Sequence, residues 1–143
     1  HIYDEKGIRE NAQALKDAFS WNDGYKEYFA VKATPNPFLI KILQEYGCGC
    51  DCSSKTELMM AKTIGAKGDD IMFSSNDTPI DEFRYCNDLG GIINLDDITH
   101  IEAVEKACGK LSRDAERFFK YCIIIIHITA SLPLMTLLRH LYL

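Results

Sequence analysis

The stretch YKEYFAVKATPN, residues 25–36, constrains the fold of this chain most strongly. Its aromatic and branched residues predict a buried β-strand over residues 25–33, with Lys32 at the carboxyl end of the strand. Pro35 and Pro37 follow at once, and they end the strand and open a helix. A lysine in this position is either a surface lysine whose stem packs along the strand or a nucleophilic amine.

The rest of the chain alternates predicted helices with predicted strands joined by short loops. We expect helices at residues 7–19, 37–47, 54–64, 77–89 and 98–108, and strands at residues 25–33, 48–53, 70–75 and 92–95. Strict alternation is typical of parallel βα units. The predicted fold class is therefore α/β, and the number of units suits half of a (βα)8 barrel or a small doubly wound sheet.

The helix boundaries follow from short polar and glycine signals. Ser54 or Thr56 is expected to cap the third helix, and Gly47 to end the second. The apolar stripe of the second helix is expected to consist of Phe38, Ile42 and Leu43.

Alternation along the second strand separates two sets of side chains. Cys48, Cys50 and Cys52 are expected to face the covering helices as small apolar residues. Asp51 lies on the opposite face, together with Gly47, Gly49 and Ser53, and the two glycines are expected to leave space around its carboxylate.

Polar residues recur where the predicted strands end. Lys32, Asp51, Asn76 and Asp96 would meet at the carboxyl ends of four parallel strands, which is where α/β barrels carry their active sites. Apolar neighbours would partly desolvate Lys32 there, and desolvation favours the neutral amine that Schiff-base chemistry requires.

Simpler interpretations exist for the residues around Lys32. Asp51 could cap the third helix, and Glu57 could serve only to complement the dipole of that helix. Cys52 as a nucleophile has little support, because no histidine lies near it in the sequence.

Charge and cysteine spacing exclude several classes of function. The formal net charge is -5 and no basic stripe is present, which argues against binding nucleic acid. The six cysteines include a C-x-C-x-C run that lacks the paired C-x2-C spacing of a zinc site. We therefore expect no metal and no disulfide, but buried reduced thiols in a cytoplasmic protein.

The character of the sequence changes after residue 110. We divide the chain into residues 1–110, the βα units, and residues 111–143, a divergent apolar tail. Residues 121–138 lack Asp, Glu, Lys and Arg and approach the length of a membrane span. They could be a membrane helix, a buried strand and helix, or a segment foreign to the fold, and we expect no membrane association.

Two motifs together resemble a known family. AVKATPNP, which contains Lys32, is followed by DCSSKTEL, which contains Asp51 and Glu57, and then by IMFSSN and GGIINLDD. This order resembles the barrel domain of the pyridoxal-phosphate-dependent decarboxylases of the alanine-racemase-like fold type. Within that group the chain is most similar to diaminopimelate decarboxylase, with ornithine and arginine decarboxylases as relatives.

The resemblance implies a cofactor and roles for three residues. Lys32 would bind pyridoxal 5'-phosphate (PLP) as a Schiff base, and Asp51 and Glu57 would lie beside the cofactor. The implied reaction is decarboxylation of an amino acid, most simply meso-diaminopimelate to lysine, in a homodimer. No role is carried over to Asn76 or Asp96.

The resemblance covers residues 1–110, and the family's later glycine-rich phosphate loop, acidic partner of the pyridine nitrogen and β domain are not found. We therefore expect an incomplete and inactive N-terminal fragment, and the opening histidine suggests that residues precede it. A half barrel would leave two strand edges unpaired. The alternative is a non-catalytic half barrel that acts as a binding or regulatory module.

Overall fold

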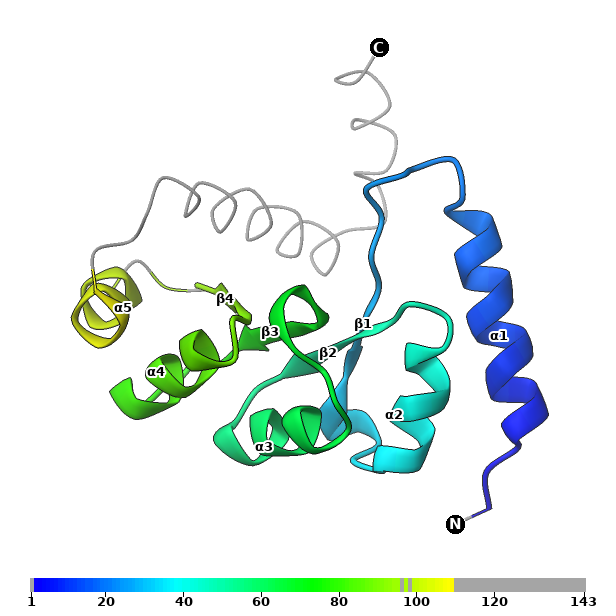
Figure 1. Cartoon of the computed structure of the whole chain (residues 1–143), viewed down its shortest axis with the longest axis horizontal. Helices are drawn as coiled ribbons and strands as arrows, with labels where there is room; N and C mark the ends of the chain where they lie inside the picture. The colour runs from blue at the N-terminus through cyan, green and yellow to red at the C-terminus, as the bar shows by residue number, and fades with distance from the viewer. Residues whose placement is uncertain (1, 96, 98, 110–143) are drawn as a thin grey trace.

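The computed structural model of this protein describes residues 2–95, 97 and 99–109. Four parallel strands alternate with helices along this part of the chain (Figure 1). Asp96 and the apolar segment 121–138 lie outside the described residues, so the expectations for them stay predictions. The elements are α1 (Glu5–Ala18), β1 (Tyr28–Ala30), η1 (Val31–Ala33), α2 (Pro37–Gln44), β2 (Gly49–Cys52), α3 (Lys55–Thr63), η2 (Gly68–Asp70), β3 (Ile71–Ser74), α4 (Ile80–Asp88), β4 (Ile92–Asn94) and α5 (His100–Cys108).

The sheet has the strand order β1-β2-β3-β4, and every neighbouring pair is parallel. Each βα unit therefore steps in the same direction, and α2, α3 and α4 lie on one side of the sheet (Figure 1). A doubly wound sheet would reverse its strand order and carry helices on both faces. Over the described residues the fold is thus the barrel type, as half of a (βα)8 barrel would be.

The hydrophobic core lies between the sheet and these helices. Cys50 and Cys52 are fully buried there, which confirms the prediction that they face the covering helices. Cys48 precedes β2 and is only half-buried. The remaining core residues are Val31, Ile40, Leu58, Ala61, Ile64, Ala66, Ile71, Phe73, Phe83, Cys86, Ile93 and Val104.

The apolar stripe predicted for the second helix is partly wrong. Ile40 is the buried residue of α2, with 1% of its surface exposed, whereas Phe38 is 78% exposed. Two residues correspond to about 200° around a helix, so Phe38 points away from the face that Ile40 presents to the sheet. Asn36 caps this helix by accepting a hydrogen bond from the Phe38 N–H at 3.0 Å. Past the helix end, Gly47 adopts a φ of 89° as predicted for a helix end.

The first strand is shorter than predicted. Only residues 28–30 pair with β2, and Val31–Ala33 form a turn of 3-10 helix instead of continuing the strand. The chain has to leave the sheet here, because the N-cap of α2 follows only three residues later. Lys32 therefore follows the strand and is not part of it.

The space that the two glycines are expected to leave beside Asp51 is not found, because the ring of Tyr28 lies against Gly49. Gly47 lies outside β2, and a Cβ added to Gly49 would approach the Tyr28 ring to 2.7 Å. The Tyr28 hydroxyl donates to the Asp69 carbonyl oxygen at 2.7 Å and so holds the ring across the sheet. Gly49 thus accommodates Tyr28, and the prediction that both glycines clear space for the Asp51 carboxylate is wrong.

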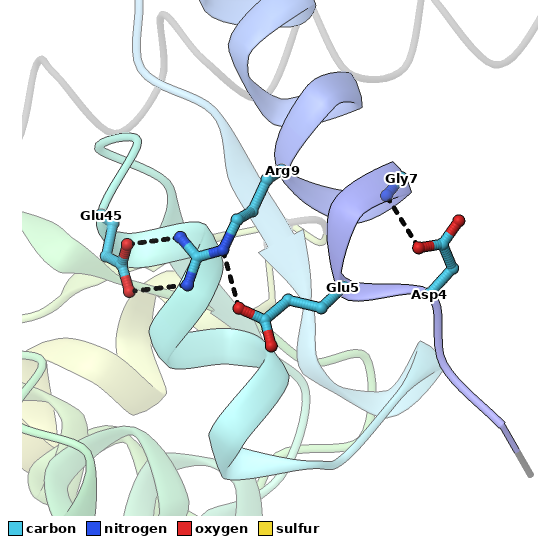
Figure 2. A network of polar contacts seen from close by, with 5 residues as sticks. All are labelled: Asp4, Glu5, Gly7, Arg9 and Glu45. Carbon is cyan, nitrogen blue, oxygen red and sulfur yellow. Dashed lines mark hydrogen bonds and ion pairs between the residues drawn. The ribbon is translucent and has the colours of Figure 1, made fainter.

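Helix α1 stands beside α2 and contributes no buried residue. Arg9 joins the two helices: its Nη1 lies 2.6 Å from Glu45 Oε2, and its Nε lies 2.8 Å from Glu5 Oε1 (Figure 2). A cavity of about 620 Å³ lies between α1, residues 25–29 and α2. Among the described residues, no helix is both long enough and apolar enough to cross a membrane.

Candidate functional site

The face of the sheet opposite the core carries a row of polar side chains near the carboxyl ends of the strands. Strand register pairs Ala30 with Asp51 and Ser74 with Asn94, and alternation puts all four on this face. We call this surface the inner face, because it would line the interior of a barrel.

Lys32 follows β1 directly and lies at the same end of the sheet. Its side chain is exposed, so the predicted partial desolvation by apolar neighbours is wrong. The reason is the short strand: the 3-10 turn carries Lys32 beyond the packed part of the sheet. Its positive charge still reaches the inner face, because it lowers the pKa of Asp51.

Asp51 is the half-buried acid of the inner face. Burial raises the pKa of its carboxyl above the ordinary value, and the negative charge of Glu57 acts in the same direction. The Ser74 hydroxyl and Lys32 oppose this rise in pKa. Oxygen Oδ1 is buried without a hydrogen-bond donor, so the carboxylate can accept a bond from a further polar group.

Asp51 does not cap α3, so that simpler interpretation is wrong. Ser54 is the N-cap, as one of the two predicted candidates, and its side chain accepts a hydrogen bond from the Glu57 N–H at 3.4 Å. The Asp51 carboxylate is therefore left for another role.

Glu57 also takes part in capping the N-terminus of α3. Its carboxylate accepts hydrogen bonds from the Ser53 N–H at 2.9 Å and from the Ser54 hydroxyl at 3.1 Å. This reciprocal arrangement is a variant of the capping box, in which the Glu57 carboxylate accepts from the N–H of Ser53, the residue before the N-cap. Glu57 thus has a structural role at the helix start, and a cofactor-binding role for it stays a prediction.

Ser74 and Asn94 belong to the inner face but were not singled out from the sequence. Asn94 donates from Nδ2 to Ser74 Oγ at 3.3 Å, and its Oδ1 is buried without a donor. Alternation from Met72 and Ile92 could have identified both residues. The polar residues that the sequence predicts at these strand ends are instead Asn76, which is exposed, and Asp96, which lies outside the described residues.

The cysteines of the described chain offer no reactive thiol on the inner face. Burial raises the pKa of the Cys52 thiol, as it raises that of Cys50 to about 11, so both stay protonated near neutral pH. A nucleophilic Cys52 is therefore disfavoured. The five described cysteines are free thiols, and no described cluster of His, Cys, Asp and Glu could hold a metal ion.

The inner face fits a cofactor that carries an aldehyde. Lys32 presents an exposed primary amine, which can condense with a carbonyl carbon. The Asp51 carboxylate beside it has a buried oxygen with unused acceptor capacity. These two groups would hold the reactive end of such a cofactor, and polar atoms from β3 and β4 extend the site.

The sequence matches the family described as "Pyridoxal-dependent decarboxylase, pyridoxal binding domain" over residues 5–131. Protein TabA of Pseudomonas amygdali pv. tabaci is 41% identical over 104 residues, covering 73% of this chain and 24% of TabA. Diaminopimelate decarboxylase of Methanothermobacter thermautotrophicus is 35% identical over 97 residues, covering 67% of this chain and 23% of that enzyme.

A solved structure shows the same fold. Diaminopimelate decarboxylase from Helicobacter pylori, complexed with L-lysine, superposes with a TM-score of 0.67 at 25% identity, covering 73% of this chain and 27% of that chain. This chain therefore spans about a quarter of the length of the curated relatives that it matches. The family match, the parallel half-barrel sheet and the order of the two motifs agree, and the chain belongs to the pyridoxal-dependent decarboxylases, whose cofactor is PLP.

Proposed function

We propose that Lys32 binds PLP covalently and that the chain is the N-terminal part of a PLP-dependent amino-acid decarboxylase. The observation that carries this proposal is the position of Lys32 directly after β1, with its charge acting on Asp51 of the adjacent strand. Active sites of α/β barrels lie at this end of the sheet.

The residues of the inner face would act on the cofactor's reactive end. The exposed Lys32 amine would attack the aldehyde, and the Asp51 carboxylate would accept a hydrogen bond or proton at its buried Oδ1. When bound, PLP supplies an electron sink for the electrons left on carbon by loss of CO2. The apolar core behind β2 and β3 keeps the strand ends in register and so fixes Asp51 relative to Lys32.

We propose meso-diaminopimelate as the substrate of the complete protein, with lysine as the product. Support comes from relatives named diaminopimelate decarboxylase and from the solved relative that is complexed with L-lysine. Ornithine or arginine remains the alternative. Because the chain spans about a quarter of its curated relatives, we propose that alone it is an incomplete and inactive fragment.

We further propose a cytoplasmic location and a homodimeric complete protein. The five free thiols of the described chain support a reducing compartment. The homodimer rests on the family resemblance alone.

Borohydride trapping tests the Lys32 assignment. The purified chain is mixed with PLP, reduced, digested and mapped for pyridoxyl-lysine. We expect one adduct, on Lys32, that is lost in Lys32→Ala and retained in Lys41→Ala, a matched change of an exposed lysine on α2. Labelling scattered over surface lysines, or equal labelling in Lys32→Ala, would contradict the proposal.

The substrate is tested by activity of a completed chain. Residues 1–109 are joined to the remaining three quarters of a related diaminopimelate decarboxylase, and CO2 release is measured with meso-diaminopimelate, ornithine and arginine. We expect release from meso-diaminopimelate, abolished by Lys32→Ala. Faster CO2 release from ornithine or arginine would contradict meso-diaminopimelate as the substrate and would support the faster-reacting amino acid instead.

A binding module without catalysis is the second candidate. Within the described residues β1 pairs only with β2, and residues just before this strand, together with Phe29 inside it, line the 620 Å³ cavity. An exposed strand edge is a template for pairing with another chain. Stable binding of this chain to a relative's barrel, with no Lys32 adduct and no turnover in the completed chain, would favour this candidate.

A further inference from the structure

Three polar side chains lie near one another in a row on the inner face: Asp51 on β2, Ser74 on β3 and Asn94 on β4. The strand register pairs Asp51 with Met72 and Ser74 with Asn94, and Ser74 shares the face of Met72 because side chains alternate along a strand. Asn94 is the far member of the row, and the described structure gives its Nδ2 one side-chain partner, the Ser74 oxygen at 3.3 Å. The Ser74 hydroxyl in turn lowers the pKa of the Asp51 carboxyl, so Ser74 connects Asn94 to the acid.

The direction of these hydrogen bonds follows from donor and acceptor chemistry. A serine hydroxyl has one proton to donate and lone pairs to accept. Since the Asn94 amide donates to Ser74 Oγ, the Ser74 proton remains available to Asp51. An ionised carboxylate accepts hydrogen bonds and donates none. Donation therefore runs in one direction, from Asn94 to Ser74 and from Ser74 to Asp51.

The charged groups that face Asp51 make this donor important. Glu57, at the start of α3, opposes a negative charge on Asp51, and Lys32, after β1, favours one. Burial also opposes the charge, and one carboxylate oxygen is buried without a donor. The Ser74 hydroxyl, a neutral donor on β3, therefore helps to keep the Asp51 carboxylate ionised and oriented.

We propose that Asn94, acting through the Ser74 hydroxyl, is a positioning residue that orients the Asp51 carboxylate beside Lys32. This inference rests on the proposed function, in which Lys32 and Asp51 bind the reactive end of PLP. Neither Ser74 nor Asn94 is required to touch the cofactor.

A double-mutant cycle without cofactor tests the row. The chain is labelled with aspartate carrying 13C at the carboxyl, the Asp51 signal is assigned with Asp51→Asn, and its titration is followed by NMR. Ser74→Ala should move the Asp51 midpoint to higher pH, and Ser74→Thr, which keeps the hydroxyl, should restore it. Asn94→Asp, which accepts where asparagine donates, should draw the Ser74 proton away and also raise the midpoint.

The double variant separates the row from simple charge repulsion. If Asn94 acts through Ser74, Asn94→Asp should raise the Asp51 midpoint less in the Ser74→Ala background than in the wild type. Equal effects in both backgrounds, or an unchanged midpoint in Ser74→Ala, would overturn the inference. The Ser74→Ala and Ser74→Thr comparison decides the Ser74 link on its own if Asn94→Asp fails to fold.

Borohydride trapping with PLP then connects the row to Lys32. Ser74→Ala should slow formation of the Lys32 adduct several-fold, and Ser74→Thr should recover it. An intact coupling of Asn94 to Asp51 with no Lys32 adduct in the wild type would overturn the proposed function and not the row. A normal rate of Lys32 labelling in Ser74→Ala would overturn the positioning role alone.

Discussion

At the scale of single residues, the half-buried carboxyl of Asp51 couples the site to stability. Burial is the largest cause of its raised pKa. Between the ordinary aspartate pKa, about 3.9, and this higher value, the folded chain binds more protons than the unfolded chain. Stability therefore falls as pH rises through this window, and the full cost of the buried charge is present at neutral pH.

Removing the charge at Asp51 should stabilise the chain at neutral pH. We expect Asp51→Asn to raise the free energy of unfolding at pH 7 by about 1 kcal/mol, because the amide is neutral and similar in shape. The gain should shrink as pH falls and vanish at about pH 3, well below the ordinary aspartate pKa, where Asp51 is protonated in both states. Urea unfolding of both proteins between pH 3 and pH 8, in steps of about one unit, measures the difference.

The exposed Asp77 supplies the control, since Asp77→Asn removes a charge from the same part of the molecule without relieving burial. A loss of stability in Asp51→Asn at pH 7 would show that Lys32 and Ser74 outweigh the cost of burial. The rate of PLP attachment to Lys32 should fall in the same variant, because the acid that costs stability is the one proposed to face the cofactor.

At the scale of elements, the start of α3 lies immediately after the Asp51 strand and fixes its carboxyl end. Ser54 and Glu57 each satisfy hydrogen-bonding groups at this helix start. We expect Ser54→Ala to lower the free energy of unfolding by about 1 kcal/mol. The double variant with Glu57→Ala should lose less than the sum, because the two residues share one capping box.

Thr56→Ala is the matched control for the capping box. Thr56 is the neighbouring exposed hydroxyl residue of the same helix turn, and its loss should leave stability nearly unchanged. Additive losses from Ser54→Ala and Glu57→Ala, measured by urea unfolding, would show that the two residues act independently.

The elements themselves could largely be predicted from the sequence. Glycines, helix caps and apolar periodicity act locally, and so the order of strands and helices and the cap at Ser54 were predicted correctly. The length of β1 could not be, because strand ends depend on the partner strand: β2 offers pairing only to residues 28–30. The exposure of Lys32 follows from this short strand, whereas that of Phe38 follows from the face of α2 that packs on the sheet.

Only part of the candidate site can be predicted from the sequence, because local motifs can be recognised there and long-range strand pairing cannot. Lys32 and Asp51 stand in motifs that are recognisable in sequence, and in the structure the charge of Lys32 acts on Asp51 by lowering the pKa of its carboxyl. Ser74 and Asn94 carry no motif, and only the register between β3 and β4 brings them together. Long-range pairing of this kind is invisible to local patterns.

At the scale of the whole molecule, α1 is attached to the rest differently from the other helices. It buries none of its residues, whereas α2 to α5 each bury at least one. Its connections to the body include the ion pair between Arg9 and Glu45 (Figure 2) and the stacking of Phe19 on Tyr25 at 4.3 Å. Helices with few buried contacts open locally, below the free energy of global unfolding.

We therefore predict that α1 opens independently of the sheet and that Arg9 controls this opening. In Arg9→Met, backbone amides of α1 should exchange with solvent several-fold faster, while amides of β2 and β3 keep the wild-type rate, because Arg9 is not part of the hydrophobic core that holds the sheet. Salt at about 1 M, where the screening length is about 3 Å, should accelerate α1 exchange in the wild type and change Arg9→Met little. Lys6→Ala is the control, since Lys6 pairs with Glu10 inside α1 and not with α2. Equal acceleration of α1 and of the sheet would mean that the helix unfolds only with the whole domain, and α1 would then be an integral part of the half barrel.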